Sequence, residues 1–149
     1  MANKFKLDEV ISGFNALKRS VPILLANQAQ NFFVDTFKNK GWPDTGQWKE
    51  VKRRIPGTTE YKYPKFKGLS RRETPILVRS GVLRRAASNS IRQATFEAIR
   101  LDVPESIKYA GVHNFGDGRV PMRKFMGHSA ILEKKQLDLI QREFNKAFK

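Results

Sequence analysis

A helical period of apolar residues over the first 37 positions constrains this chain more than any other feature of its sequence. Pro22 interrupts the period, so we expect either one long helix with a kink or two helices, the second capped by Ser20. Gly41 is the expected C-terminal cap, ahead of Trp42-Pro43. The residues that keep spacings of three and four, and so share one side of a helix, are Leu7, Val10, Ile11, Phe14, Leu17, Val21, Leu24, Leu25, Ala29, Phe32, Phe33 and Phe37.

Residues 42–75 break this period and are predicted to form one long loop. Glycine and proline recur throughout this segment, and it is longer than an ordinary connection between elements, so we expect it to be functional or disordered. Trp42 and Trp48 at its start are expected to pin the loop to the core rather than to bind a ligand. We expect that core to contain Phe32, Phe33 and Phe37.

The second half of the chain predicts short strands and a closing helix. Residues 91–95 and 97–103 are typical of strands, and 107–112 predict a further strand, whereas 82–87 fit either a helical turn or a strand. An amphipathic helix is expected from Ser129 onwards. The expected fold is therefore α+β, in one domain of residues 1–149. A long N-terminal helix and a C-terminal helix pack on a small antiparallel β-sheet, with an extended basic loop at 42–75.

Positive charge is concentrated in the middle of the chain. The whole sequence has 29 Lys and Arg against 14 Asp and Glu, and residues 49–85 alone hold 12 basic against three acidic side chains. Such an excess attracts phosphate, acidic protein or anionic lipid. We weigh non-specific nucleic-acid contact equally against a solvated loop that maintains solubility or docks on an acidic partner. The expected contact residues are Lys52, Arg53, Arg54, Lys62, Lys65, Lys67, Arg71 and Arg72.

Composition and spacing give no support for catalysis. The chain has no cysteine, which excludes disulfides, thiolate chemistry and cysteine-built zinc sites. His113, Asp117 and His128 are the only set that resembles a metal site, and their spacing does not support one. We therefore expect no enzyme activity, no metal and no cofactor. No apolar run approaches the ~20 residues of a bilayer span, and no signal peptide is recognisable, so synthesis in the cytoplasm and no membrane partner are expected.

Four segments, in order, resemble the phage virion morphogenesis proteins of the Mu G type, which are similar to tail-completion proteins of long-tailed phages. The first runs from Gly41-Trp42-Pro43 to Trp48, and the second is residues 75–86, with Ser80-Gly81 followed by Leu83-Arg84-Arg85. The third, residues 109–116, is close to the family's Tyr-Ala-x-x-His-x-x-Gly segment, and the fourth, residues 120–127, to its Pro-x-Arg-x-Phe-hydrophobic-Gly segment. Ser80 stands where the family usually has threonine, and Ala86-Ala87 where serine is common.

The resemblance implies a structural, non-enzymatic protein of a tailed bacteriophage virion. It would form a ring of several copies, such as a hexamer, at the head-to-tail junction, as a neck or tail-completion component. Portal, adaptor or tail-tube proteins would be its partners, with non-specific contact to packaged double-stranded DNA. The rival prediction is a free, non-specific nucleic-acid-binding protein that uses residues 49–85.

The resemblance also implies structural roles for particular residues. His113 would lie at a strand edge and lock the turn that follows, and Phe125 would be buried. Arg123 would cap backbone carbonyls or pair with a carboxylate of a neighbouring subunit. The positions expected to form the structural motif are Trp48, Arg84, Arg85, His113, Gly116, Pro121, Arg123 and Phe125.

Overall fold

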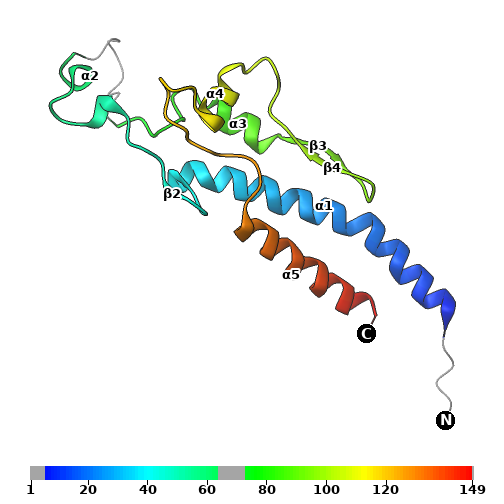
Figure 1. Cartoon of the computed structure of the whole chain (residues 1–149). Coiled ribbons are helices and arrows are strands. Elements are labelled where there is room, and N and C mark those ends of the chain that lie inside the picture. The colour runs from blue at the N-terminus through cyan, green and yellow to red at the C-terminus, as the bar shows by residue number, and fades with distance from the viewer. Residues whose placement is uncertain (1–5, 64–72, 149) are drawn as a thin grey trace.

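A computed structural model describes residues 6–63 and 73–148 of the chain, and one long helix runs through it (Figure 1). This helix, α1 (Leu7–Asn39), is continuous through Pro22, so the prediction of two helices capped by Ser20 is wrong. Pro22 has no N–H to donate, but its ring is buried, and packing of the surrounding face retains the helix there. At 1.5 Å per residue, α1 is about 50 Å long.

The C-terminus of α1 differs by one residue from the prediction. Lys40, not Gly41, takes the left-handed conformation of the cap, and its backbone N–H donates to the Thr36 carbonyl. Gly41 is needed for another reason, because a Cβ there would lie 2.7 Å from the carbonyl oxygen of Gly46. That close approach belongs to an antiparallel pair, β1 (Gly41–Trp42) and β2 (Gly46–Gln47), directly after the helix.

A second antiparallel pair lies along α1. Strand β3 (Ile91–Ala94) pairs with β4 (Ile99–Leu101), in a register that joins Ile91 to Leu101 and shifts before Gln93. Strand β3 matches the predicted segment, whereas β4 covers only the centre of residues 97–103. The two pairs are separate two-stranded sheets. The β3–β4 pair is the part of the predicted sheet that forms, whereas β1–β2 lies where the sequence predicted the start of the loop.

Two short helices flank this pair in sequence. Helix α3 (Val82–Ser88) resolves the choice at 82–87 in favour of a helix. Helix α4 (Tyr109–Phe115) replaces the strand predicted for 107–112, which was wrong. The physical reason is that Ile107 and Ala110 pack on the core and Asn114 is buried, so the buried positions follow helical spacings of three and four. Because Asn114 is polar, the pattern of apolar residues alone did not show this spacing.

The segment predicted as a loop contains local structure. A 3₁₀ turn, η1 (Lys52–Arg54), is followed by the single-turn helix α2 (Thr59–Lys62). The Thr58 side chain accepts a hydrogen bond from the Tyr61 backbone N–H, which is an ordinary N-cap. Both elements lie at one end of the molecule, beyond the C-terminus of α1 (Figure 1).

The closing helix begins where the sequence predicted it. Helix α5 (Ala130–Ala147) is capped by the Ser129 hydroxyl, which accepts from the Leu132 backbone N–H at 3.2 Å. It lies beside α1, and the β3–β4 pair lies along α1 on another side (Figure 1). The α+β class is therefore confirmed, with α1 as the element that α3, α5, β1 and the β3–β4 pair contact.

The core consists of two adjoining clusters at the C-terminal end of α1. One gathers Phe37, Trp48, Ile76, Leu83, Ala87 and Phe125. The other gathers Ala29, Phe32, Phe33, Trp42 and Leu132. The predictions that the three phenylalanines are core and that both tryptophans pin the following segment to it are confirmed, since all five side chains are buried.

Candidate functional site

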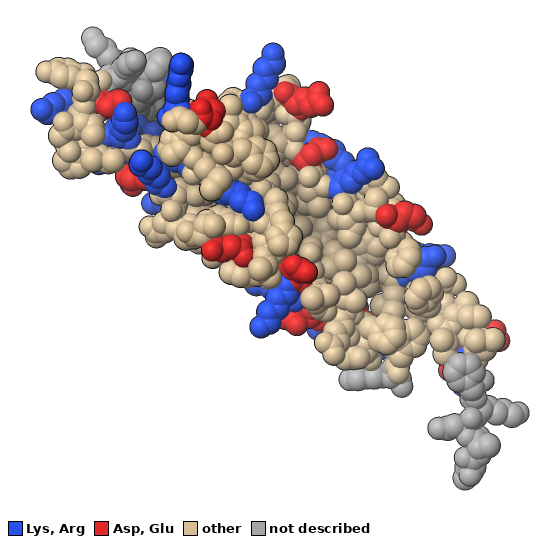
Figure 2. Space-filling view, in the orientation of Figure 1, with Lys and Arg blue, Asp and Glu red and all other residues tan. Residues whose placement is uncertain are grey.

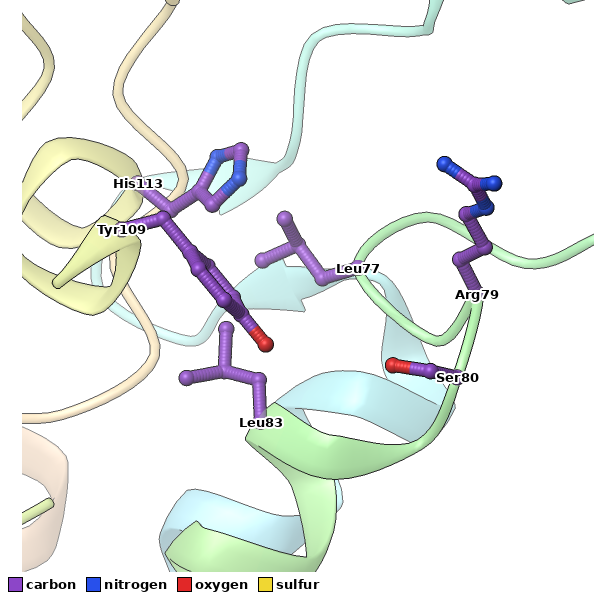
Figure 3. A pocket seen from close by; sticks show the side chains of 6 residues that line it. All are labelled: Leu77, Arg79, Ser80, Leu83, Tyr109 and His113. Atoms are coloured by element: carbon purple, nitrogen blue, oxygen red, sulfur yellow. The ribbon is translucent and has the colours of Figure 1, made fainter. Parts of the chain in front are cut away.

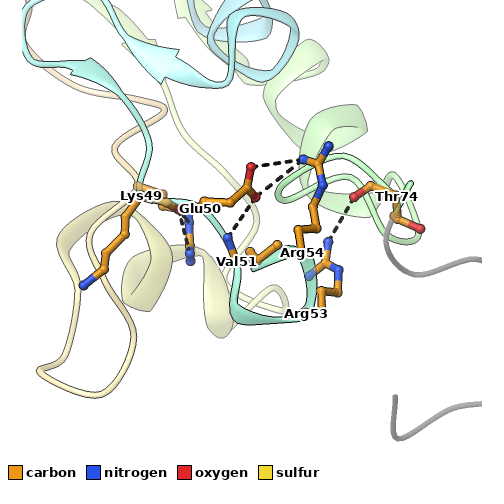
Figure 4. A network of polar contacts seen from close by, with 7 residues as sticks. Lys49, Glu50, Val51, Arg53, Arg54 and Thr74 are labelled. Atoms are coloured by element: carbon orange, nitrogen blue, oxygen red, sulfur yellow. Dashed lines mark hydrogen bonds and ion pairs between the residues drawn. The ribbon is translucent and has the colours of Figure 1, made fainter. Parts of the chain in front are cut away.

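Charged residues of the basic segment, residues 49–85, make contacts within that segment (Figure 4). Arg53 donates through Nη2 to the Thr74 carbonyl at 3.0 Å, and Arg54 Nη1 lies 3.4 Å from a Glu50 carboxylate oxygen. These two arginines therefore contribute to local structure as well as to charge. The other predicted contacts Lys65, Lys67, Arg71 and Arg72 lie outside the described residues.

Lys52 and Lys62 present their charge at the surface of the same segment. Both side chains are exposed, and Lys52 Nζ lies 4.0 Å from a carboxylate oxygen of Glu60, a distance at which an exposed pair contributes little. Figure 2 shows lysine and arginine side chains at the end of the molecule that carries η1 and α2, with carboxylates among them. This end is a mixed but predominantly basic surface.

Three hydrogen bonds, one donated by Trp48 and two by Arg123, fasten the start of the basic segment to residues 123–124. Trp48 Nε1 donates to the Lys124 carbonyl at 2.9 Å, and the Arg123 guanidinium donates to the Lys49 carbonyl at 3.1 and 3.0 Å. Arg123 is buried, and that burial lowers the pKa of its guanidinium, against the opposing charge of Glu50. The expectation that Arg123 caps a carbonyl is confirmed, and we call this arrangement the Trp48–Arg123 clasp.

Asn114 organises the other side of the clasp, and the sequence reasoning did not single it out. Its Oδ1 accepts from the backbone N–H groups of Phe125 and Met126 at 2.9 and 3.1 Å, and its Nδ2 donates to the Met126 carbonyl at 3.0 Å. The backbone of Arg123 is also tied to α4, by donation to the His113 carbonyl at 2.7 Å. The sequence signal that could have identified Asn114 is its helical spacing of four residues from Ala110, which places it on the side of the helix that faces the core.

Phe125 and the residues before it occupy the positions expected of a structural motif. Phe125 is buried against Phe37, with ring centroids 5.4 Å apart, as predicted. Gly116 ends α4 at φ +76°, and a Cβ there would lie 3.2 Å from the Met122 backbone nitrogen, so glycine is required. Pro121 is half-buried in the same crossover.

The two arginines of the second resemblance segment face outwards. Arg84 and Arg85 are exposed on α3. Gly81 precedes them at φ +70°, and a Cβ there would lie 2.8 Å from the Arg85 guanidinium. The element Ser80-Gly81 thus forms the left-handed start of a helix that carries positive charge on its exposed face.

His113 lies in a helix and not at a strand edge, so that part of the prediction is wrong. It borders a pocket of about 450 Å³ that also contacts residues of the loop before α3 (Figure 3). Burial, and then the charge of Arg123, lower the pKa of the imidazole, while Asp117 opposes the shift. The pocket joins the second and third resemblance segments, which are distant in the sequence. Its lining is Leu77, Arg79, Ser80, Leu83, Tyr109 and His113.

A second depression, of about 280 Å³, is almost entirely apolar. It lies between the N-terminal half of α1, the turn between β3 and β4, and the C-terminal half of α5. Phe14 and Phe144 on its walls are 48% and 52% exposed, and the α1 stripe continues from it through Ile11 to Leu7, both exposed. We call this depression and the adjoining stripe the apolar groove.

Comparisons with known proteins identify no relative of this chain: no family model, no curated protein and no solved structure matches it. Among residues 6–63 and 73–148, His113, Asp117 and His128 do not form a metal-binding cluster, and neither does any other group of three potential ligands. Over the same described part of the chain, no helix has both the length and the apolar character that a membrane crossing requires.

Proposed function

We propose that this chain is a structural protein of a tailed bacteriophage virion, which assembles as a ring at the head-to-tail junction and joins portal or adaptor proteins to the tail. The resemblance of the four segments supplies this class of protein. The observation that carries assembly is the apolar groove, because it leaves aromatic side chains of α1 and α5 uncovered within one chain.

Uncovered apolar surface of this kind favours contact between chains. Monomeric proteins rarely expose large continuous apolar patches, and burial of such surface contributes about 25 cal/mol per Å². When one copy covers the groove of the next with a different part of its own surface, the contact is heterologous, and a suitable rotation closes it into a ring. The groove lies at the N-terminal half of α1 and the clasp packs at its C-terminal end, where Trp48 contacts Phe37. In the proposed assembly this arrangement separates self-assembly from contacts with other proteins.

The basic end of the molecule suits acidic companions or packaged DNA. Lys52 and Lys62 are exposed there, and the side chains of Arg84 and Arg85 project from α3. Such charges hold phosphate or carboxylate surfaces without reading a base sequence. In the proposed assembly this end faces the DNA channel or a neighbouring neck protein, and no bond is made or broken.

Sedimentation of the full chain tests this proposal. We expect an assembly of several copies that persists when salt is raised, because apolar contacts are not screened. Changing Phe14 and Phe144 together to serine should yield monomers that keep the circular dichroism spectrum of the folded chain, with a lower unfolding midpoint because assembly no longer stabilises the fold. Phe115→Ser is the matched control, since Phe115 is exposed at the end of α4 and does not line the groove. A strictly monomeric wild-type chain would contradict the proposal.

The rival function, free non-specific nucleic-acid binding, is favoured by the same exposed lysines and is distinguished by salt. A monomer that binds duplex DNA should lose affinity linearly on a plot of log affinity against log salt concentration. Lys52→Glu with Lys62→Glu should then reduce both the affinity and the slope. If the chain is monomeric and shows this behaviour, the rival replaces the ring.

A further inference from the structure

The pocket beside His113 combines polar groups with an apolar floor. Leu77, Leu83 and the ring of Tyr109 provide apolar surface, whereas Arg79 and Ser80 stand on the opposite wall from His113 (Figure 3). The volume of about 450 Å³ is enough for one amino-acid side chain and adjoining backbone, and it falls in the range of small-ligand sites.

His113 offers a hydrogen-bond donor to this pocket. Its Nδ1 is buried without a hydrogen-bond partner, and Nε2 is not among the buried side-chain atoms of the described residues that lack one. A buried N–H without a partner is rarer and costlier than a buried lone pair, so we assign the proton of the neutral ring to Nε2. The lowered pKa keeps the ring neutral at pH 7, with Nδ1 as the lone pair.

The pocket wall also contains an unusual backbone conformation. Leu77 has φ +60°, in the left-handed region that residues other than glycine rarely adopt. Strained residues of this kind concentrate at binding and catalytic sites, where the surrounding structure holds them. At Leu77 the strained conformation places an apolar side chain between His113 and Arg79 (Figure 3).

We infer that this pocket binds the carboxylate of a glutamate side chain presented by an acidic companion protein. The Nε2–H of His113 and the hydroxyls of Ser80 and Tyr109 donate to the carboxylate, and Arg79 adds positive charge at the rim. Leu77 and Leu83 contact the methylene groups of the glutamate.

The composition of the pocket and the charge of the chain favour this ligand over a phosphodiester. A phosphodiester has no apolar stem for the two leucines to contact, whereas the net charge of +15 attracts an acidic companion. The inference rests on the proposed function only for the location of the companion protein in a virion, because the isolated chain contains the whole pocket and can be tested for binding by itself.

Nuclear magnetic resonance of the histidine rings tests the inference on the full chain. Acetyl-Ala-Glu-Ala-amide should shift the His113 ring signals saturably and leave those of His128, the only other histidine and an exposed one, unmoved. The glutamine analogue, which lacks the charge, should bind at least about tenfold more weakly. Equal responses to the two peptides, equal shifts of both histidines, or no shift would overturn the inference.

Variants and a nucleic-acid probe sharpen the test. Arg79→Gln and Tyr109→Phe should each weaken binding of the glutamate peptide at least about threefold, whereas Arg100→Gln, the same charge change on exposed β4, should not. A thymidine dinucleotide that shifts His113 more strongly than the peptide does would replace the glutamate with a phosphate. A monomer that binds the peptide contradicts the ring alone, and a ring that does not bind it contradicts this pocket alone.

Discussion

The two ends of α1 have the same apolar period but differ in what covers them. At the C-terminal end, Trp42 is 1% exposed and Phe125 2% exposed, and both lie over phenylalanines of the helix. At the N-terminal end, Leu7, Ile11 and Phe14 continue the stripe yet remain exposed. The chain therefore covers one end of the helix fully, while the β3–β4 turn and the end of α5 cover the other end only in part.

A single apolar pattern on a helix can have two roles, packing within the chain and contact with other chains, and the two ends of α1 differ in this respect. Burial at the C-terminal end is secured by directed contacts, the Trp48–Arg123 clasp and the three hydrogen bonds of Asn114, which allow one arrangement only. The apolar groove is lined almost entirely by apolar side chains that remain partly exposed. Stability should thus depend on the first end and assembly on the second.

The largest expected effect compares one phenylalanine from each end. Phe125→Ala should lower the free energy of unfolding by roughly 3 to 5 kcal/mol, because it leaves a cavity beneath Phe37 and Trp48. Phe144→Ala, at a half-exposed position in α5, should cost under about 1 kcal/mol. Urea unfolding measures both values. Comparable losses would show that the two ends do not differ in the way proposed.

Asn114→Ala tests whether directed contacts, and not only apolar burial, define the packed end. It leaves two backbone N–H groups and one carbonyl without their partner, which should cost about 2 kcal/mol or more. Asn89→Ala is the control, since the side chain of Asn89 is exposed and makes a single bond to the Arg85 carbonyl. If both substitutions have the same small effect in urea unfolding, packing alone holds residues 125–126 against α4.

The sequence predicted the helices well where period and capping agreed. The α1 stripe, the Ser129 cap of α5 and strand β3 followed from local rules, because each depends on neighbours in sequence. Helix α4 was misjudged because its buried face includes a polar residue, Asn114, whose partners lie 11 and 12 residues further along the chain. The cap at Lys40 was misjudged because Gly41 serves the β1–β2 approach instead.

The candidate site was less accessible to sequence reasoning than the fold. Burial of Phe125 and carbonyl capping by Arg123 followed from the resemblance, but the pairing of Trp48 with Lys124 joins positions 76 residues apart. The His113 pocket requires α3 and α4 to meet, which no local pattern indicates. The apolar groove was present in the sequence as a stripe, but a stripe does not show whether its partner lies in the same chain.

The smallest expected effect lies at Asp44, where α5 joins the packed end. Asp44 Oδ1 accepts from the Ala130 and Ile131 backbone N–H groups at 3.0 and 3.4 Å. The pKa of Asp44 is held below its ordinary value of 3.8, first by a hydrogen bond with the Ser129 side chain and then by these two. Because its folded pKa is the lower one, its contribution to stability is complete above the ordinary pKa and is lost as pH falls through the folded pKa.

Asp44→Asn should therefore flatten the decline of stability with acid below about pH 5, because the amide oxygen can still accept hydrogen bonds but carries no charge. Unfolding midpoints measured from neutral pH down into this range test the slope. Asp138→Asn, at an exposed aspartate of α5, controls for the loss of one negative charge. Parallel acid profiles for wild type and Asp44→Asn would mean that the charge of Asp44 does not hold the start of α5. Ser129 and the packing of α5 on α1 would then hold it, so burial and uncharged hydrogen bonds would secure α5 as they secure the rest of the packed end.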